Sequence, residues 1–130
     1  MGDISSGYDS PEQQQKAERE AILAPLRAEF RHIRWWHLDG FGLVVVRRMR
    51  KTEALAFTQK THVASKTYDA SGDPHGMVDC NESAVKTCCV WPKDRDSLKH
   101  AFDEYPNFSG EAALAISQMA DEGITAGGKD

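Results

Sequence analysis

The sequence predicts an α+β fold, a mainly helical small domain of four to five helices with one β-hairpin. Apolar residues recur at three- and four-residue steps in several segments, most clearly from Met77 to Trp91. Between Arg31 and Arg48 the period changes to two, and Asp39-Gly40 separates two apolar runs there. The chain has 130 residues, of which 40% are hydrophobic and 28% charged, as is typical of one soluble globular domain.

The first helix is predicted to begin at Pro11. Residues 1–10 are polar and show no period, so we expect a flexible leader there. Ser10 suits an N-cap and Pro11 suits the first turn, whereas Pro25 predicts either a kink or the start of a second short helix. The predicted organisation is a leader over 1–10, a single globular domain over 11–123 and a flexible tail over 124–130.

The hairpin is predicted from the Asp39-Gly40 turn. A two-residue turn predicts three cross-strand pairs: Leu38 with Phe41, Trp36 with Leu43, and Trp35 with Val44. This register divides the apolar side chains into one face with Trp36, Leu38, Phe41, Leu43 and Val45, and another with Ile33, Trp35, Val44 and Val46. One layer of helices cannot cover two apolar faces, so we expect the second face, or an open edge, to contact another chain. The alternative is that the leader or residues 66–76 fold over it.

A basic run, Arg47 to Lys51, follows the hairpin. Thr52 is the predicted N-cap of a helix that continues through Ala64, and residues 65–76 are predicted to form a surface loop. Cations just before a helix oppose its dipole, so helix stability does not explain the basic run. It either contacts an acidic partner or phosphate, or keeps the end of the hairpin soluble.

Three more helices are predicted after the loop. The first is the run from Met77 to Trp91, which Pro92 ends. Asp94 or Asp96 is the predicted cap of the next, whose apolar side chains are Leu98, Ala101, Phe102 and Tyr105. Ser109 is the predicted cap of the last, which ends at Gly123 and whose apolar side chains are Ala112, Leu114, Ala115, Ile116, Met119 and Ala120.

The residues predict no reaction centre, metal site or cofactor. Cys80, Cys88 and Cys89 lack the spacing of a disulfide framework, so we expect reduced, buried thiols; a zinc site with His75 or His100 is the alternative. Asp73 with His75 is interpreted as turn chemistry rather than as a metal or proton-transfer pair. Catalytic, nucleotide-binding and metalloprotease motifs are absent from the sequence.

The charge and hydropathy patterns limit the partners. The net charge of -4 does not favour nonspecific nucleic-acid binding by the whole surface. The longest apolar run, from Leu43 to Val46, is far below the about 20 residues of a membrane-spanning helix, so no membrane partner is expected. The N-terminus lacks the pattern of a signal peptide.

Residues 43–123 resemble the small tail assembly chaperones of long-tailed bacteriophages and prophages. The matching segments are Val44-Val45-Val46-Arg47-Arg48 followed by Thr52-Glu53, Ala84-Val85-Lys86-Thr87-Cys88-Cys89-Val90-Trp91-Pro92, and Tyr105-Pro106 before a last helix that ends at Gly123. The family often has a proline where this chain has Met49, and the first helix with the Trp35-Trp36 strand lies outside the resemblance.

The resemblance implies a non-enzymatic protein of the host bacterial cytoplasm, without cofactors. Such proteins coat the helical tape measure protein until tail tube protein replaces them, and some form homo-oligomers. Many of their genes also yield a longer product by ribosomal frameshifting. The predicted partner contacts are five apolar side chains with three arginines as a polar rim: Trp35, Trp36, Phe41, Val44, Val46, Arg47, Arg48 and Arg50.

Two other functions fit the same sequence. A structural tail or neck subunit would remain in the finished virion, whereas a chaperone would not. A small nucleic-acid-binding regulator would use Arg47 to Lys51, and its binding would weaken steeply with salt. An enzyme is the function that the residues support least.

Overall fold

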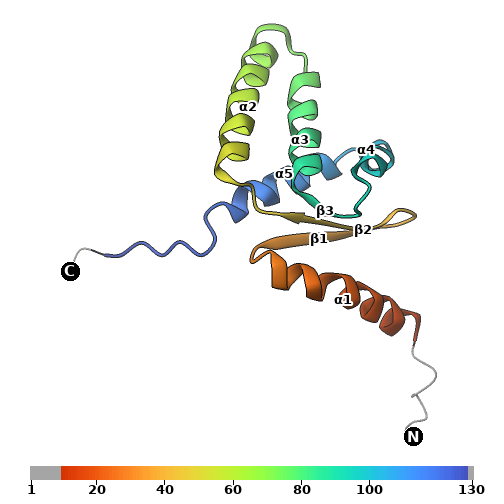
Figure 1. Ribbon diagram of the computed structural model, residues 1–130. Helices are drawn as coiled ribbons and strands as arrows, with labels where there is room; N and C mark the ends of the chain where they lie inside the picture. The colour runs from red at the N-terminus through yellow and green to blue at the C-terminus, as the bar shows by residue number, and fades with distance from the viewer. Residues whose placement is uncertain (1–9, 129–130) are drawn as a thin grey trace, which may run out of the picture. The chain divides into compact units, whose positions relative to one another are not determined.

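The computed structural model describes residues 10–128 as a small α+β fold (Figure 1). Within this range it has five α-helices, one short 3-10 helix and a three-stranded antiparallel sheet. The elements are α1 (Pro11–Glu29), β1 (Ile33–Leu38), β2 (Gly42–Arg47), α2 (Lys51–Ser71), α3 (His75–Cys88), β3 (Cys89–Trp91), η2 (Arg95–Ser97), α4 (Leu98–Glu104) and α5 (Phe108–Met119). The predicted fold class is therefore confirmed.

The described chain divides into two compact units after Arg31. The first contains α1, and the second contains the sheet and helices α2 to α5. The predicted leader lies, up to residue 9, outside the described residues. Of the predicted tail, residues 124–128 have no regular secondary structure and residues 129–130 are not described.

Helix α1 begins as the sequence predicts. The Ser10 hydroxyl accepts a hydrogen bond from the Gln13 N–H at 3.1 Å, and the Gln13 side chain accepts one from the Ser10 N–H at 2.8 Å. Because Pro11 has no N–H, three N–H groups at the helix start lack an intrahelical partner, and these two bonds satisfy two of them. The helix continues past Pro25 to Glu29, so no second helix begins at that proline.

The predicted hairpin register is wrong by one residue. The connection has three residues, Asp39 to Phe41, because Gly40 and Gly42 both adopt positive φ angles, +79° and +118°. Trp36 therefore pairs with Val44 and Trp35 with Val45. A one-residue shift moves every side chain of a strand to the other face. One face carries Trp36, Leu38, Val44 and Val46, and the other carries Ile33, Trp35, Leu43 and Val45.

A third strand, β3, pairs with β2 and was not predicted. The predicted helix over 77–91 ends at Cys88, and Cys89 to Trp91 run antiparallel to β2. Pro92 disfavours helical dihedral angles at Trp91, and the free edge of β2 provides hydrogen-bond partners for extended backbone.

Helix α2 is longer than predicted, and its N-cap is Arg50 rather than Thr52. Glu53 accepts a hydrogen bond from the Arg50 N–H at 2.8 Å. The predicted loop from residue 65 is helical up to Ser71, because the backbone breakers begin only at Gly72, whose φ is +73°. Residues 66–76 therefore do not fold over the hairpin; they form the tip of the α2–α3 pair, which projects away from the sheet (Figure 1).

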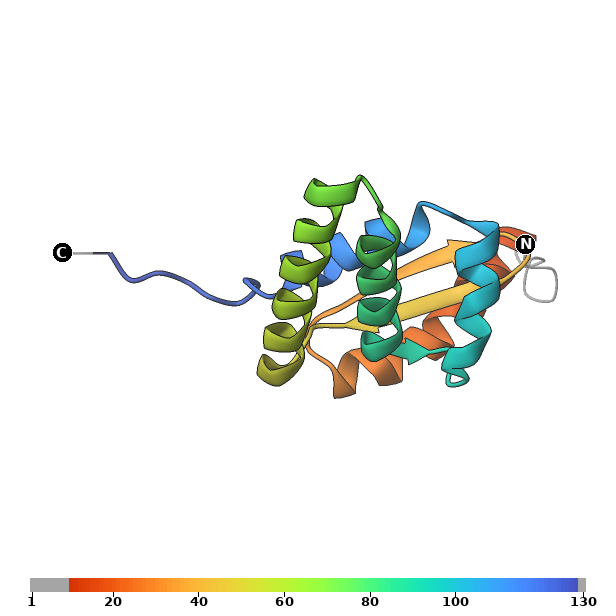
Figure 2. The same cartoon turned by 90° about the horizontal axis from the view of Figure 1, so that it is seen from above.

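The core lies between the sheet and helices α3, α4 and α5 (Figure 2). Its buried side chains are Leu38, Val44, Val46, Val85, Cys88, Cys89, Leu98, Ala101, Phe102, Phe108, Ala112, Ile116 and Met119. In α5 the predicted inward residues are buried except for Leu114, Ala115 and Ala120, and the N-cap is Asn107. Ser109, the predicted cap, is itself buried within the first turn.

Candidate partner-binding site

Most of the predicted apolar contact residues belong to the core of the described chain. Val44 and Val46 are fully buried. Trp36 and Phe41 are partly buried and pack against the core, and the Trp36 ring meets the Phe108 ring edge-on, with centroids 5.5 Å apart. Trp35 is on the other face of the sheet and is 38% exposed. These five side chains therefore do not form one exposed surface.

The predicted polar rim is also divided. Arg47 is only 7% exposed and binds both carboxylate oxygens of Glu53, at 2.8 and 2.9 Å. Arg48 donates a hydrogen bond to the Glu122 carbonyl at 2.8 Å, beyond the C-terminus of α5. Of the three arginines, Arg47 is buried, Arg48 is half-buried and Arg50 is exposed. Two of the three cations thus hold elements of the fold together.

The Arg47–Glu53 pair connects β2 with the start of α2 and the end of α3. Arg47 also donates a hydrogen bond to the Thr87 carbonyl at 3.2 Å, near the C-terminus of α3. The hydrogen bond from Arg47, helped by the Arg50 N–H, lowers the pKa of Glu53 to about 2. The same hydrogen bond raises the pKa of Arg47. The ion pair therefore fixes where the two helices leave the sheet.

The stability of the fold is expected to fall in acid because of Glu53. Its pKa is about 2 in the folded protein, against an ordinary value of 4.5. The folded state holds fewer protons, so the stabilisation is complete above about pH 4.5 and is lost as the pH falls towards 2. Chemical denaturation at pH 6, 4 and 2.5 measures this loss. The wild-type chain should lose about 2 kcal/mol more than Glu53→Gln over this range; equal losses would contradict the assignment.

Helix α2 leaves several apolar side chains exposed to solvent. Of its 21 residues only Ala64 is buried. Leu55 and Val63 are 61% and 60% exposed. At the start of α3, Met77 and Val78 belong to the apolar stripe of the run from Met77 to Trp91, but they are 41% and 44% exposed. Helices of this kind usually gain their stability from an apolar face that packs on something else.

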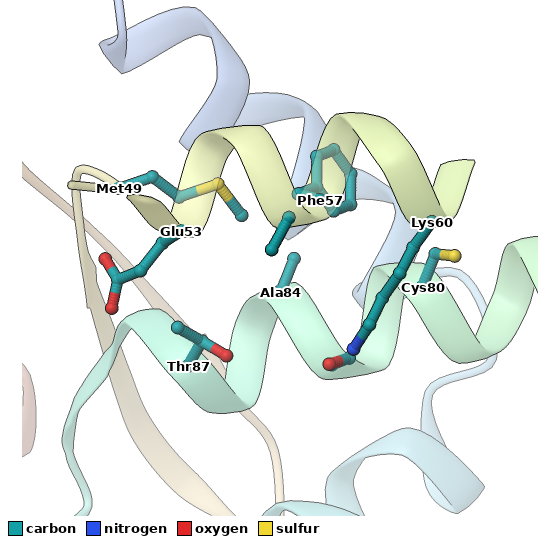
Figure 3. Close-up of a pocket in the computed structure, with 9 residues that line it drawn as sticks. Met49, Glu53, Phe57, Lys60, Cys80, Ala84 and Thr87 are labelled. Atoms are coloured by element: carbon teal, nitrogen blue, oxygen red, sulfur yellow. The ribbon is translucent and has the colours of Figure 1, made fainter. Parts of the chain in front are cut away.

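A groove of about 140 Å³ lies between α2 and α3 (Figure 3). Its lining residues are Met49, Glu53, Ala56, Phe57, Lys60, Cys80, Ser83, Ala84 and Thr87. In Figure 3 the small Ala84 side chain points from α3 towards α2, the Phe57 ring lies against α2, and Lys60 extends from α2 towards α3. Small residues bring the two helices close together towards the tip, where a Cβ on Gly76 would lie 3.2 Å from that of Ala64. This groove is the candidate site.

The three cysteines, in α3 and β3, were the candidate metal ligands. Within residues 10–128 no three His, Cys, Asp or Glu side chains are placed to hold a metal ion, so the zinc site considered above is not assembled. All three cysteines are free and buried, as predicted. Burial raises the pKa of the Cys88 and Cys89 thiols to about 11, which keeps them protonated and weakly nucleophilic at neutral pH.

The Asp73–His75 pair is part of an exposed turn. The Asp73 carboxylate accepts the His75 backbone N–H at 3.0 Å and lies 2.6 Å from the His75 Nδ1 atom. These hydrogen bonds lower the pKa of Asp73 and raise that of His75. Their geometry is that of a local turn immediately before α3.

No family model, no curated protein and no solved structure matches this chain. In the part of the chain that the structure describes, none of the helices has the length and apolar composition needed to span a bilayer.

Proposed function

We propose that this chain is a non-enzymatic protein-binding factor of phage tail assembly, a chaperone that holds the tape measure protein in the host bacterial cytoplasm. The exposed apolar side chains of α2 are the observation that carries the proposal, since Leu55 and Val63 are 61% and 60% exposed. A partner helix on α2 and α3 would cover this surface, as in other helix-in-groove complexes. The phage assignment rests on the resemblance of residues 43–123.

The alternative of a nucleic-acid-binding regulator has less support from the site. Of the basic run Arg47 to Lys51, the first two cations, Arg47 and Arg48, donate hydrogen bonds within the fold. A cation already neutralised by a carboxylate contributes little to phosphate binding. A structural tail subunit would use the same protein-binding surface. Only experiment distinguishes such a subunit from a chaperone.

A tagged pull-down from cells that produce the particle tests the proposal. The eluate and the purified particles are both examined by mass spectrometry. We expect a long, helix-rich tape measure protein in the eluate and none of this chain in the particle. Copies retained in the particle would instead indicate a structural subunit, and nucleic acid alone in the eluate would contradict both proposals.

A further inference from the structure

We infer that the α2–α3 groove recognises an acidic amphipathic helix, taking up one large apolar side chain and pairing Lys60 with a carboxylate one helical turn away. This inference deepens the proposed function, because it takes the partner to be a helical protein. The binding site is the α2–α3 groove, and it selects a partner helix that carries a negative charge beside an apolar side chain.

The size and lining of the groove fit a single side chain. Its volume is about 140 Å³, and Ala56, Phe57 and Ala84 provide apolar walls. Cofactors and small-molecule ligands usually occupy about 300–1,000 Å³. A leucine, methionine or phenylalanine of a partner helix is the occupant that matches this space and these walls.

The charges around the groove favour a carboxylate. Lys60 makes no ion pair with any residue in the range 10–128, and its side chain crosses the groove from α2 towards α3 (Figure 3). Glu53 is the one acidic residue of the lining, and Arg47 neutralises it at 2.8 Å. A carboxylate that enters the groove is therefore attracted by the Lys60 ammonium and is not repelled by an unpaired negative charge in the lining.

The spacing along α2 fits a helix that lies beside it. Phe57 and Lys60 are three residues apart, which is one helical turn. An apolar residue and a carboxylate at i and i+3 or i+4 of the partner would reach both. Val63 follows Ala56 by two turns on the same side of α2 and is exposed, so the apolar surface continues beyond the groove.

Two synthetic helical peptides of 18 residues test the inference. They are amphipathic and identical, with a central leucine, except that the fourth residue after the leucine is glutamate in one and lysine in the other. Binding to the full chain is measured by fluorescence anisotropy. We expect the glutamate peptide to bind about three- to tenfold more tightly, and Lys60→Glu to reverse the order.

Matched variants separate recognition from general charge and folding effects. Lys99→Glu makes the same charge change at an exposed position of α4, and it should leave the preference unchanged. Ala56→Trp fills the groove from its exposed rim and should weaken both peptides at least tenfold. Circular dichroism checks that each variant is folded.

Three outcomes would overturn the inference: no binding of either peptide, equal binding of both, or a preference that survives Lys60→Glu. Self-association that Ala56→Trp abolishes would also overturn it, because the occupant would then be a second copy of the chain. A negative pull-down and a negative peptide experiment are separate results. Peptide binding without a tape measure protein in the eluate would retain the groove and reject the phage role.

Discussion

Replacing Phe108 by alanine is expected to lower the free energy of unfolding by about 3–5 kcal/mol. Phe108 is 3% exposed at the first position of α5. Its ring lies 5.5 Å from that of Trp36 on β1 and 6.2 Å from that of Phe102 on α4. The alanine variant leaves a cavity where the sheet and two helices meet, and it removes both ring contacts. Urea denaturation followed by circular dichroism measures the loss.

Two variants in the same helix calibrate this result. Phe108→Leu keeps most of the apolar volume and should cost about 1–2 kcal/mol. Leu114→Ala changes a side chain that is 60% exposed, so its effect should stay within about 0.5 kcal/mol. If Phe108→Ala and Leu114→Ala had equal effects, the described core would be wrong at this position.

The element types were predictable wherever a strong local signal was present. Ser10 and Pro11 predicted the start of α1. Asp94 or Asp96 was the predicted cap of the next helix; Asp94 instead caps the 3-10 helix η2, where its carboxylate accepts the Asp96 N–H at 3.1 Å, and the N-cap of α4 is Ser97. These signals depend on the chain within a few residues, so tertiary structure does not alter them. The α+β class followed from the two periods of the apolar pattern.

The errors occurred where several local solutions were equally good. Asp39-Gly40 is compatible with two- or three-residue connections, and Gly42, also at positive φ, takes part in the longer one. Val90 and Trp91 suit a helix or a strand until the edge of β2 is available to pair with them. In both cases the neighbouring strand determines which conformation forms, and the local sequence does not identify that strand.

The candidate site was missed for the same reason. Phe57 and Ala84 lie in two segments that were predicted to be helical, but nothing local shows that these helices pair. One signal was available: the apolar stripe of α3 begins at Met77 and Val78, which the fold leaves exposed. An apolar stripe on a helix that continues past the buried core indicates a binding partner. Here the exposed end of the stripe lies on the α2–α3 pair.

Glu53→Gln is the second substitution that is expected to lower the free energy of unfolding strongly. Glu53→Gln leaves Arg47, which is 7% exposed, without a compensating charge. Breaking a fully buried pair costs about 3–5 kcal/mol; because the Glu53 side chain is 21% exposed, we expect about 2–3 kcal/mol. Denaturation at pH 7 measures this change.

A double variant separates the role of the ion pair from that of packing. Arg47→Met with Glu53→Leu removes both charges and keeps similar volumes, so no unpaired charge remains. We expect it to be at least about 1 kcal/mol more stable than Glu53→Gln, because two buried charges replaced together also remove their desolvation cost. Its peptide affinity should nevertheless fall, since Glu53 and the Arg47 contact with Thr87 set the end of the groove. A double variant less stable than the single one would show that packing, not charge, holds α2 and α3 in place.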